Sequence, residues 1–254
     1  MSGTLLNCIA ILIGSLIGVR VGDRLPASMR DSIMNGLGLI TLVVGMDNAL
    51  KTGNILVPLI GLLLGTVIGE TLDLDGALKR FGGWLQGRVE RPNADAATVS
   101  ASRTRFINGF VTASLVFCVG PLAVLGSIKN GLNPADIQLL AIKSTLDFFA
   151  SIAFSATLGI GVAFSILPTI VLQGGFALVG IALVGVLSAG TGVLSSSNPY
   201  IRELTGVGGV MLIGISLVLL NLKQVKVANF LPGLVLTPLI VLVAGLIGVN
   251  IYPL

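Results

Sequence analysis

Apolar stretches of about 20 residues recur along nearly the whole chain, and short polar segments separate them. A helix of this length crosses the hydrocarbon core of a bilayer, and lipid cannot hydrogen-bond backbone groups left free by any other open structure. The pattern therefore predicts an all-α, polytopic membrane helix bundle of about eight transmembrane helices. The predicted helices cover residues 4–20, 30–50, 54–71, 106–127, 137–158, 163–187, 204–222 and 230–250.

Composition supports a single membrane domain over residues 1–254. Charged residues make up 10% of the chain and hydrophobic residues 54%, with a mean hydropathy of +1.01. Soluble domains carry roughly 25% charged residues. We therefore expect the lipid bilayer as a partner, and we interpret the net charge of +4 as loop topology and not as affinity for nucleic acid.

Lysine and arginine are distributed unequally between the predicted loops. One set of alternate loops holds most of them, while the other holds Lys51, Lys129 and Arg202. Cytoplasmic loops carry an excess of these residues, so we expect both termini to lie outside. The basic residues on the predicted cytoplasmic side are Arg20, Arg24, Arg30, Lys79, Arg80, Arg88, Arg91, Arg103, Arg105, Lys223 and Lys226.

The longest connection, residues 72–105, is predicted to be cytoplasmic. Apolar side chains in its segment 75–90 share one helical face and basic side chains lie off that face, which is typical of a helix lying on an anionic membrane surface. The small, polar residues of 91–102 predict a mobile linker. The residues assigned to the membrane surface are Lys79, Arg80, Trp84 and Arg88.

Two predicted helices carry glycine at every fourth position, which gives each helix one flat face. Flat faces let neighbouring backbones approach closely and pack by dispersion in lipid. The partner of each face lies either in the same subunit or in a second copy, so a homo-oligomer remains open. The two rows are Gly14, Gly18, Gly22 and Gly61, Gly65, Gly69.

The first three predicted helices resemble the last three. Segments 29–58 and 201–232 share an order of features: a basic–acidic pair, a pair of glycines, an asparagine, and an asparagine shortly before a proline. Five predicted spans separate the starts of the two triplets, so the copies would be inverted across the membrane, as in many secondary transporters. Chance similarity between helices rich in glycine and leucine is the alternative.

The apolar stretch 141–173 contains a charged pair, Lys143 and Asp147. Residues four apart share a helix face, and at about 1.5 Å per residue the two lie roughly 10 and 15 Å from the predicted outer end of their helix. An isolated charge at that depth costs several kcal/mol, so we expect an ion pair or a water-filled cavity. The pair either fixes helix packing or binds a solute, with Asp147 taking a cation or proton or Lys143 taking an anion.

Features around this pair favour a function. Glycines and prolines nearby, including Gly120-Pro121, can interrupt helices and expose backbone groups to a ligand. Intramembrane amides could serve as ligands, although each is more often an interhelical hydrogen-bonding group. The candidate substrate- or ion-binding residues are Asp147, Lys143, Ser144, Ser151, Gly159, Gly161, Gln173 and Asn108.

The chain contains no histidine, which excludes histidine-based zinc motifs, Ser-His-Asp triads and imidazole relays. No nucleophile with an adjacent base is visible without it. We therefore expect a protein that is not an enzyme and that carries no metal and no cofactor.

A family resemblance rests on a long composite motif. The run LVFCVGPLAVLGSIKNGL at 115–132, followed by KSTLDFFASIAFSATLGIGVAFSILPTIVLQGG at 143–175, resembles the YqgA/YdfK-like family of uncharacterised bacterial inner-membrane proteins. The opening GTLLNCIAILIGSLIG and the later NFLPGL are similar as well, so the resemblance covers the whole chain. One departure is Phe148, where the family pattern implies glycine. The resemblance implies a multi-pass protein of the bacterial inner membrane and supplies no substrate.

The sequence leaves two main hypotheses for function. The first is a small-solute or ion transporter or channel whose pathway lies near the fourth to sixth predicted helices. The second is a non-transporting membrane scaffold or signalling component that acts through segment 75–90 and the glycine faces. A membrane enzyme is a third and weaker alternative.

Overall fold

The computed structural model describes residues 2–89, 96–118, 121–182, 198–249 and 251–252. These residues are helical or lie in short connections, and none of them forms a strand. The chain divides into two compact units, which are described separately. Unit 1 takes its residues from 1–37, 76–118 and 122–181, and unit 2 takes its residues from 38–75, 119–121 and 182–254.

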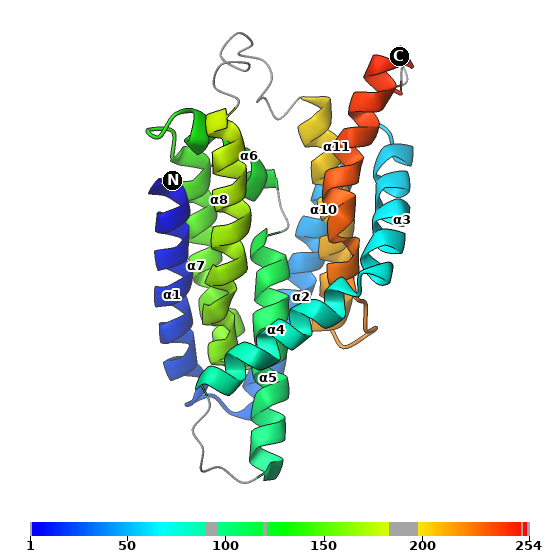
Figure 1. The fold of residues 1–254 in the computed structure, drawn as a ribbon. Coiled ribbons are helices and arrows are strands. Elements are labelled where there is room, and N and C mark those ends of the chain that lie inside the picture. The colour runs from blue at the N-terminus through cyan, green and yellow to red at the C-terminus, as the bar shows by residue number, and fades with distance from the viewer. Residues whose placement is uncertain (1, 90–95, 119–120, 183–197, 250, 253–254) are drawn as a thin grey trace. The chain divides into compact units, whose positions relative to one another are not determined.

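In unit 1, α1 (Ser2–Gly22) and α7 (Gln138–Leu158) lie side by side (Figure 1). A Cβ added at Gly14 would collide with the Phe148 carbonyl, and one added at Gly18 would collide with the Ile152 carbonyl. The residue numbers of the contacting positions increase together along α1 and α7, so the two helices run parallel. The glycine row of α1 therefore gives direct backbone contact with α7.

The other helices of unit 1 are α4 (Leu74–Val89), α5 (Ala96–Cys118), α6 (Pro121–Leu132) and α8 (Ile166–Ala182). The single helix predicted at 106–127 is in fact two helices, with an angle of 62° between α5 and α6. Helix α5 also begins within the segment predicted as a linker, since residues from Ala96 onward are helical. Residues 91–95 of that predicted linker lie outside the described residues.

A sharp backbone change at Gly159 ends α7. Its φ of 79° and ψ of −162° lie in a region that residues with a side chain rarely adopt. A six-residue 3₁₀ segment, η1 (Ile160–Ser165), follows and leads into α8. A Cβ added at Gly161 would meet the Phe106 carbonyl, so this glycine allows η1 to pack against α5.

Unit 2 contains α3 (Leu56–Thr71), α10 (Pro199–Leu219), η2 (Val227–Phe230) and α11 (Leu231–Leu246). Helices α3 and α11 pack together through the second glycine row (Figure 1). Gly61 faces Thr237, Gly65 faces Gly233 and Gly69 faces Asn229. The contacting residue numbers decrease toward the start of α11 as they increase along α3, so α3 and α11 are antiparallel.

Helix α2 (Ala27–Ala49) contributes its first residues to unit 1 and the rest to unit 2. Within unit 2, its Gly45 lies against Gly209 and Ile213 of α10. The close approach of two glycines places the helix backbones in contact. The pairing of α2 with α10 again depends on small residues and not on large apolar side chains.

Several large apolar side chains of α3 instead point outward. On α3 the glycines are buried, whereas Leu63 and Leu64 are at least half exposed. This arrangement suits a lipid solvent, which is as apolar as leucine and gives no reason to bury it.

Five described helical segments are long and apolar enough to cross a membrane, or up to seven if each bent helix pair is one span. Helix α2, which corresponds to the predicted helix 30–50, does not meet this criterion; it carries Arg30, Asp31 and Asp47. The number eight therefore stays a prediction.

Candidate functional site

The charged pair of α7 is buried inside unit 1. The side chains of Lys143 and Asp147 are only 7% and 9% exposed, and Lys143 Nζ donates to Asp147 Oδ2. Asn7 Nδ2 of α1 donates a hydrogen bond of 3.0 Å to the same oxygen. One carboxylate oxygen thus accepts from an ammonium and an amide on two parallel helices.

The end of α5 also lies close to the pair. Lys143 Nζ lies 5.9 Å from the ring centroid of Phe117, within the range of a cation–π contact. Cys118, the next residue, is buried and lies within electrostatic range of both charges. Its Sγ is 4.0 Å from Thr169 Oγ1 of α8. Helices α1, α5 and α7 therefore meet around the pair, and α8 contacts the end of α5.

A buried polar row continues along α7 from this point. Ser151 and Ser155 follow Asp147 at four-residue intervals on the same face, and both are fully buried. Ser151 Oγ donates 2.8 Å to the Phe148 carbonyl. Ser155 Oγ has no hydrogen-bond partner among the described residues. Burial of a hydroxyl without a partner costs free energy, so it calls for an explanation.

Helix α1 presents similar groups. Thr4, Asn7 and Ser15 are all at most 4% exposed. Thr4 Oγ1, Asn7 Oδ1 and Ser15 Oγ have no hydrogen-bond partner within the part of the chain that the structure describes. We call the α7 row and these α1 residues together the polar seam of unit 1. The seam consists of Lys143, Asp147, Ser151, Ser155, Thr4, Asn7 and Ser15.

Gln173 of α8 leaves two buried side-chain atoms without a hydrogen-bond partner in the described part of unit 1. Its side chain is fully buried, and neither Oε1 nor Nε2 has a partner among the described residues. It lies one helical turn beyond Thr169, which contacts Cys118. An amide in an apolar interior with both atoms unsatisfied is ready to bind a polar ligand or water.

The remaining predicted site residues have different surroundings. Ser144 Oγ donates 2.6 Å to the Leu140 carbonyl on its own helix. Gly159 ends α7, and Gly161 packs against α5. Asn108 of α5 is exposed, so the structure does not bring it to the Lys143–Asp147 pair.

The predicted surface residues lie on α4. Lys79 and Arg80 are exposed, and Trp84 is 54% exposed. The Trp84 ring stacks on Phe81 at 5.7 Å between centroids, and the Arg88 guanidinium lies 5.0 Å from the Trp84 ring. The aromatic pair and the basic groups therefore share the exposed side of the helix.

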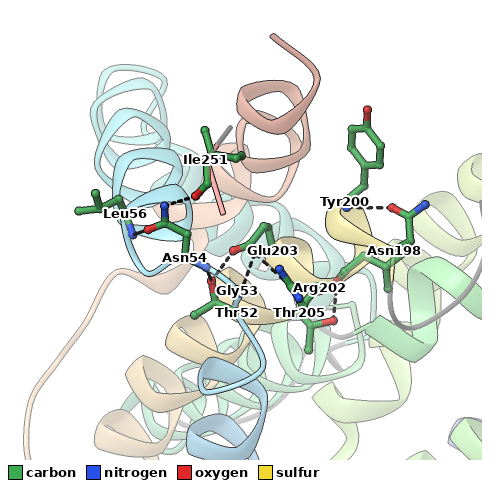
Figure 2. Close-up of polar contacts among 11 residues, drawn as sticks. Thr52, Gly53, Asn54, Leu56, Asn198, Tyr200, Arg202, Glu203, Thr205 and Ile251 are labelled. Atoms are coloured by element: carbon green, nitrogen blue, oxygen red, sulfur yellow. Dashed lines mark hydrogen bonds and ion pairs between the residues drawn. The ribbon is translucent and has the colours of Figure 1, made fainter. Parts of the chain in front are cut away.

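Unit 2 contains a second polar cluster, centred on Glu203 (Figure 2). Glu203 is fully buried near the start of α10. Thr52 Oγ1 donates to its Oε2, and the Gly53 amide donates 2.8 Å to Oε1. Arg202 Nε lies 3.7 Å from the same Oε1. The connection between α2 and α3 is thus attached to the start of α10.

The C-terminal residues join this cluster. Asn54 Nδ2 donates to the Ile251 carbonyl, as Figure 2 shows. The Arg202 guanidinium lies 4.7 Å from the centre of the Tyr252 ring. Burial, and then the charge of Glu203, raise the pKa of Tyr252 to about 12. In the sequence, Glu203 is notable only as the acidic member of the basic–acidic pair in the predicted repeat. Its role in this cluster could not be predicted, because its partners lie about 150 residues away.

Comparison with known proteins identifies the family. The family model described as "Protein of unknown function (DUF554)" matches residues 2–242. The chain belongs to this family. It is 27% identical over 235 residues to "Uncharacterized protein YqgA" of Escherichia coli (strain K12), covering 92% of this chain and 93% of the relative.

A second relative extends the comparison. The chain is 26% identical over 258 residues to "Uncharacterized membrane protein YdfK" of Bacillus subtilis (strain 168), covering 98% of this chain and 100% of that protein. No solved structure matched. The description of this relative as a membrane protein agrees with the apolar helices described above, and the resemblance noted from the sequence is confirmed. The protein is a multi-pass membrane protein.

Proposed function

We propose that this protein is a transporter or channel for a small solute or ion, with its pathway along the polar seam of unit 1. The observation that carries the proposal is the fully buried amide of Gln173, which lacks partners among the described residues and lies one helical turn beyond Thr169, whose hydroxyl contacts Cys118 at the end of α5. A membrane protein keeps such groups at a cost, and intramembrane polar groups commonly mark solute pathways.

The pair itself supplies a mechanism for responding to an ion. Asp147 Oδ2 is shared by Lys143 and Asn7. An arriving proton or cation would compete with Lys143 for this oxygen, because Oδ2 already accepts two hydrogen bonds. Lys143, once released, would turn toward the Phe117 ring or toward an anion. Occupancy of Asp147 would thereby change the contacts between α7 and α5.

The predicted inverted repeat would give the protein the architecture of many secondary transporters. Asn54 lies just before α3 and binds the Ile251 carbonyl, beyond the end of α11. Asn229 lies just before α11 and binds Glu70, in the last turn of α3. Each asparagine of the predicted repeat therefore contacts the far end of the other copy's helix. An experimental structure in which no pseudo-two-fold axis relates the triplet α1, α2 and α3 to the triplet α8, α10 and α11 would contradict the repeat.

The location and partners follow from the same proposal. The protein would lie in the bacterial inner membrane with both termini outside, would act on an unidentified small solute or ion, and would bind neither nucleic acid nor a cofactor. It would not be an enzyme. Association into a homo-oligomer would use surfaces other than the glycine rows, since Gly18 and Gly65 already contact α7 and α11.

The decisive experiment is flux through purified protein in liposomes. Proton entry driven by a potassium diffusion potential would be followed with an internal pH dye, first for wild type and then for Asp147→Asn. Asp47→Asn is the matched control, because Asp47 forms an exposed pair with Lys51 at the same spacing and at 2.5 Å. We expect loss of flux in Asp147→Asn alone. Equal flux in both variants would remove Asp147 from the mechanism.

The exposed side of α4 favours a scaffold as the second candidate function. Phe81 and Trp84 are 42% and 54% exposed and stack on each other. Exposed aromatic side chains are typical of contact with a partner or with the membrane interface. A scaffold would lose its partner on Trp84→Ala while flux stayed absent in wild type and variant alike. A transporter would keep its flux in the same variant.

A further inference from the structure

A cavity of about 190 Å³ lies in unit 1 where α7 ends. It is partly open and is bordered by the end of α1, the start of the apolar part of α5, and the turn at Gly159. Its polar lining includes Asp23, Arg105 and Ser155, and its walls include Val19 and Phe106. Drug-sized ligands occupy pockets of roughly 300–1,000 Å³, so this cavity suits a smaller molecule.

Arg105 is held in place at this cavity. Its Nε donates 2.9 Å to the Thr157 carbonyl in the last turn of α7. The guanidinium lies over Gly159, where an added Cβ would come within 3.5 Å of Nε. Its other two nitrogens have no hydrogen-bond partner among the described residues. The side chain is therefore oriented by one bond and keeps donors available for a ligand.

The charges around the cavity are of both signs. Asp23 lines it and carries no side-chain hydrogen bond within the described residues. Arg30 lies within electrostatic range of Arg105, and its Nη2 donates 2.5 Å to the Gly22 carbonyl. A simple anion would be attracted by two arginines and repelled by Asp23. A simple cation would be attracted by Asp23 and repelled by the two arginines.

Ser155 adds a buried hydroxyl donor to the cavity lining. Its side chain is fully buried, lines the cavity, and has no partner for Oγ among the described residues. The wall beside it is apolar, with Leu158 and Ile160 completing the lining. A ligand that occupied the cavity would satisfy this hydroxyl and place an apolar group against these side chains.

We propose that this cavity binds a small zwitterion of the α-amino acid class. The carboxylate binds the free guanidinium donors of Arg105 and the hydroxyl of Ser155, since charge-assisted hydrogen bonds to a carboxylate suit the fork of arginine. The ammonium group faces Asp23. A short aliphatic side chain packs against Val19 and Phe106. This arrangement uses each charge of the cavity, which neither an anion nor a cation alone does.

The cavity shares Ser155 with the polar seam. Ser155 belongs to the α7 row and lies about 12 Å along the helix from Asp147, at 1.5 Å per residue. The binding of the zwitterion stands on the cavity alone. That the same molecule is the transported solute rests on the proposed function.

Binding to the purified full-length protein in detergent tests the site. Titration calorimetry would use L-alanine, with propionate and ethylamine as probes that each lack one charge. We expect L-alanine to bind and each probe to bind at least about tenfold more weakly, because each loses one charge-assisted contact. Propionate binding as tight as that of L-alanine would overturn the zwitterion and leave an anion site. No heat with any of the three would overturn the site itself.

Variants assign the contacts. Asp23→Asn and Arg105→Gln should each weaken L-alanine binding at least about tenfold. Arg103→Gln, on the same helix but outside the cavity lining, should leave it unchanged. Arg105 also contacts the end of α7, so Arg105→Gln alone is ambiguous if it unfolds. Asp23 is exposed, and unchanged binding in folded Asp23→Asn would overturn the proposal.

The two proposals fail in different ways. Binding of L-alanine without flux in liposomes would overturn transport and leave the zwitterion site standing. Proton flux that depends on Asp147, with no binding of L-alanine, would overturn the zwitterion site and leave transport standing.

Discussion

Asp147 Oδ2 accepts hydrogen bonds from both Lys143, on its own helix, and Asn7, which lies far away in the sequence on α1. The Asp147 side chain is 9% exposed, so these two partners, and not water, surround its charge. A buried charge that loses its partner is strongly destabilising, whereas replacement of a whole pair by apolar groups is often neutral. This asymmetry makes the pair testable.

Substitution of the pair should be strongly non-additive. We expect Lys143→Met and Asp147→Leu each to lower the free energy of unfolding by roughly 3–5 kcal/mol, and the double variant to lower it by clearly less than their sum. Denaturant titration in detergent measures all three. Lys51→Met serves as the control, because its exposed pair should change stability by about 0–1 kcal/mol. Additive losses would mean that the two charges do not stabilise each other.

Glycine substitutions should depend on what each glycine faces. At Gly18 an added Cβ would collide with the Ile152 carbonyl, so Gly18→Ala should destabilise the protein by roughly 1–3 kcal/mol. Gly36 has nothing within 4 Å, so Gly36→Ala should be neutral or stabilise by up to about 1 kcal/mol. Thermal unfolding of the two variants checks the difference. Equal effects would contradict close contact between α1 and α7.

The phenol of Tyr252 should ionise only at high pH. Burial and Glu203 raise its pKa to about 12, against about 10 for an unfolded chain. A raised pKa means that the folded state favours the neutral phenol. This contribution to stability is complete below about pH 10 and is lost as the pH rises toward 12. Absorbance titration in a Tyr200→Phe background isolates Tyr252, and Glu203→Gln should lower the observed pKa.

The topology predicted from basic residues can be tested with fusions. Both termini are predicted outside, so a C-terminal reporter that is active only in the cytoplasm should stay silent, while a phosphatase that is active only outside should work. Signal from the cytoplasmic reporter would contradict either the orientation or the even number of spans.

Helix positions were largely predictable from the apolar pattern. The predicted helix 137–158 corresponds to α7 at Gln138–Leu158, and 54–71 corresponds to α3 at Leu56–Thr71. Prediction was poorer around 106–127, where the structure has both α5 and α6. Hydropathy averages over a window, so it does not register a local bend or the earlier start of α5 at Ala96.

The candidate site was predictable only in part. Spacing alone placed Lys143 beside Asp147, because residues four apart are neighbours on any helix. It could not identify Asn7, or the cavity at Arg105, because those depend on which helices pack together. Asn108 was predicted as a ligand but is exposed, since its polarity indicated nothing about the direction of its helix face.

The sequence by itself determined that this is a helical, multi-pass membrane protein with a costly charged pair in an apolar segment, because hydropathy and the i, i+4 relation are local properties. Only the tertiary structure decided that α1 covers α7, that Glu203 binds Thr52 and Gly53, and that Gln173 is left unsatisfied among the described residues. These are contacts between segments far apart in the chain. They depend on the close approach of glycine faces, whose partners no local pattern specifies.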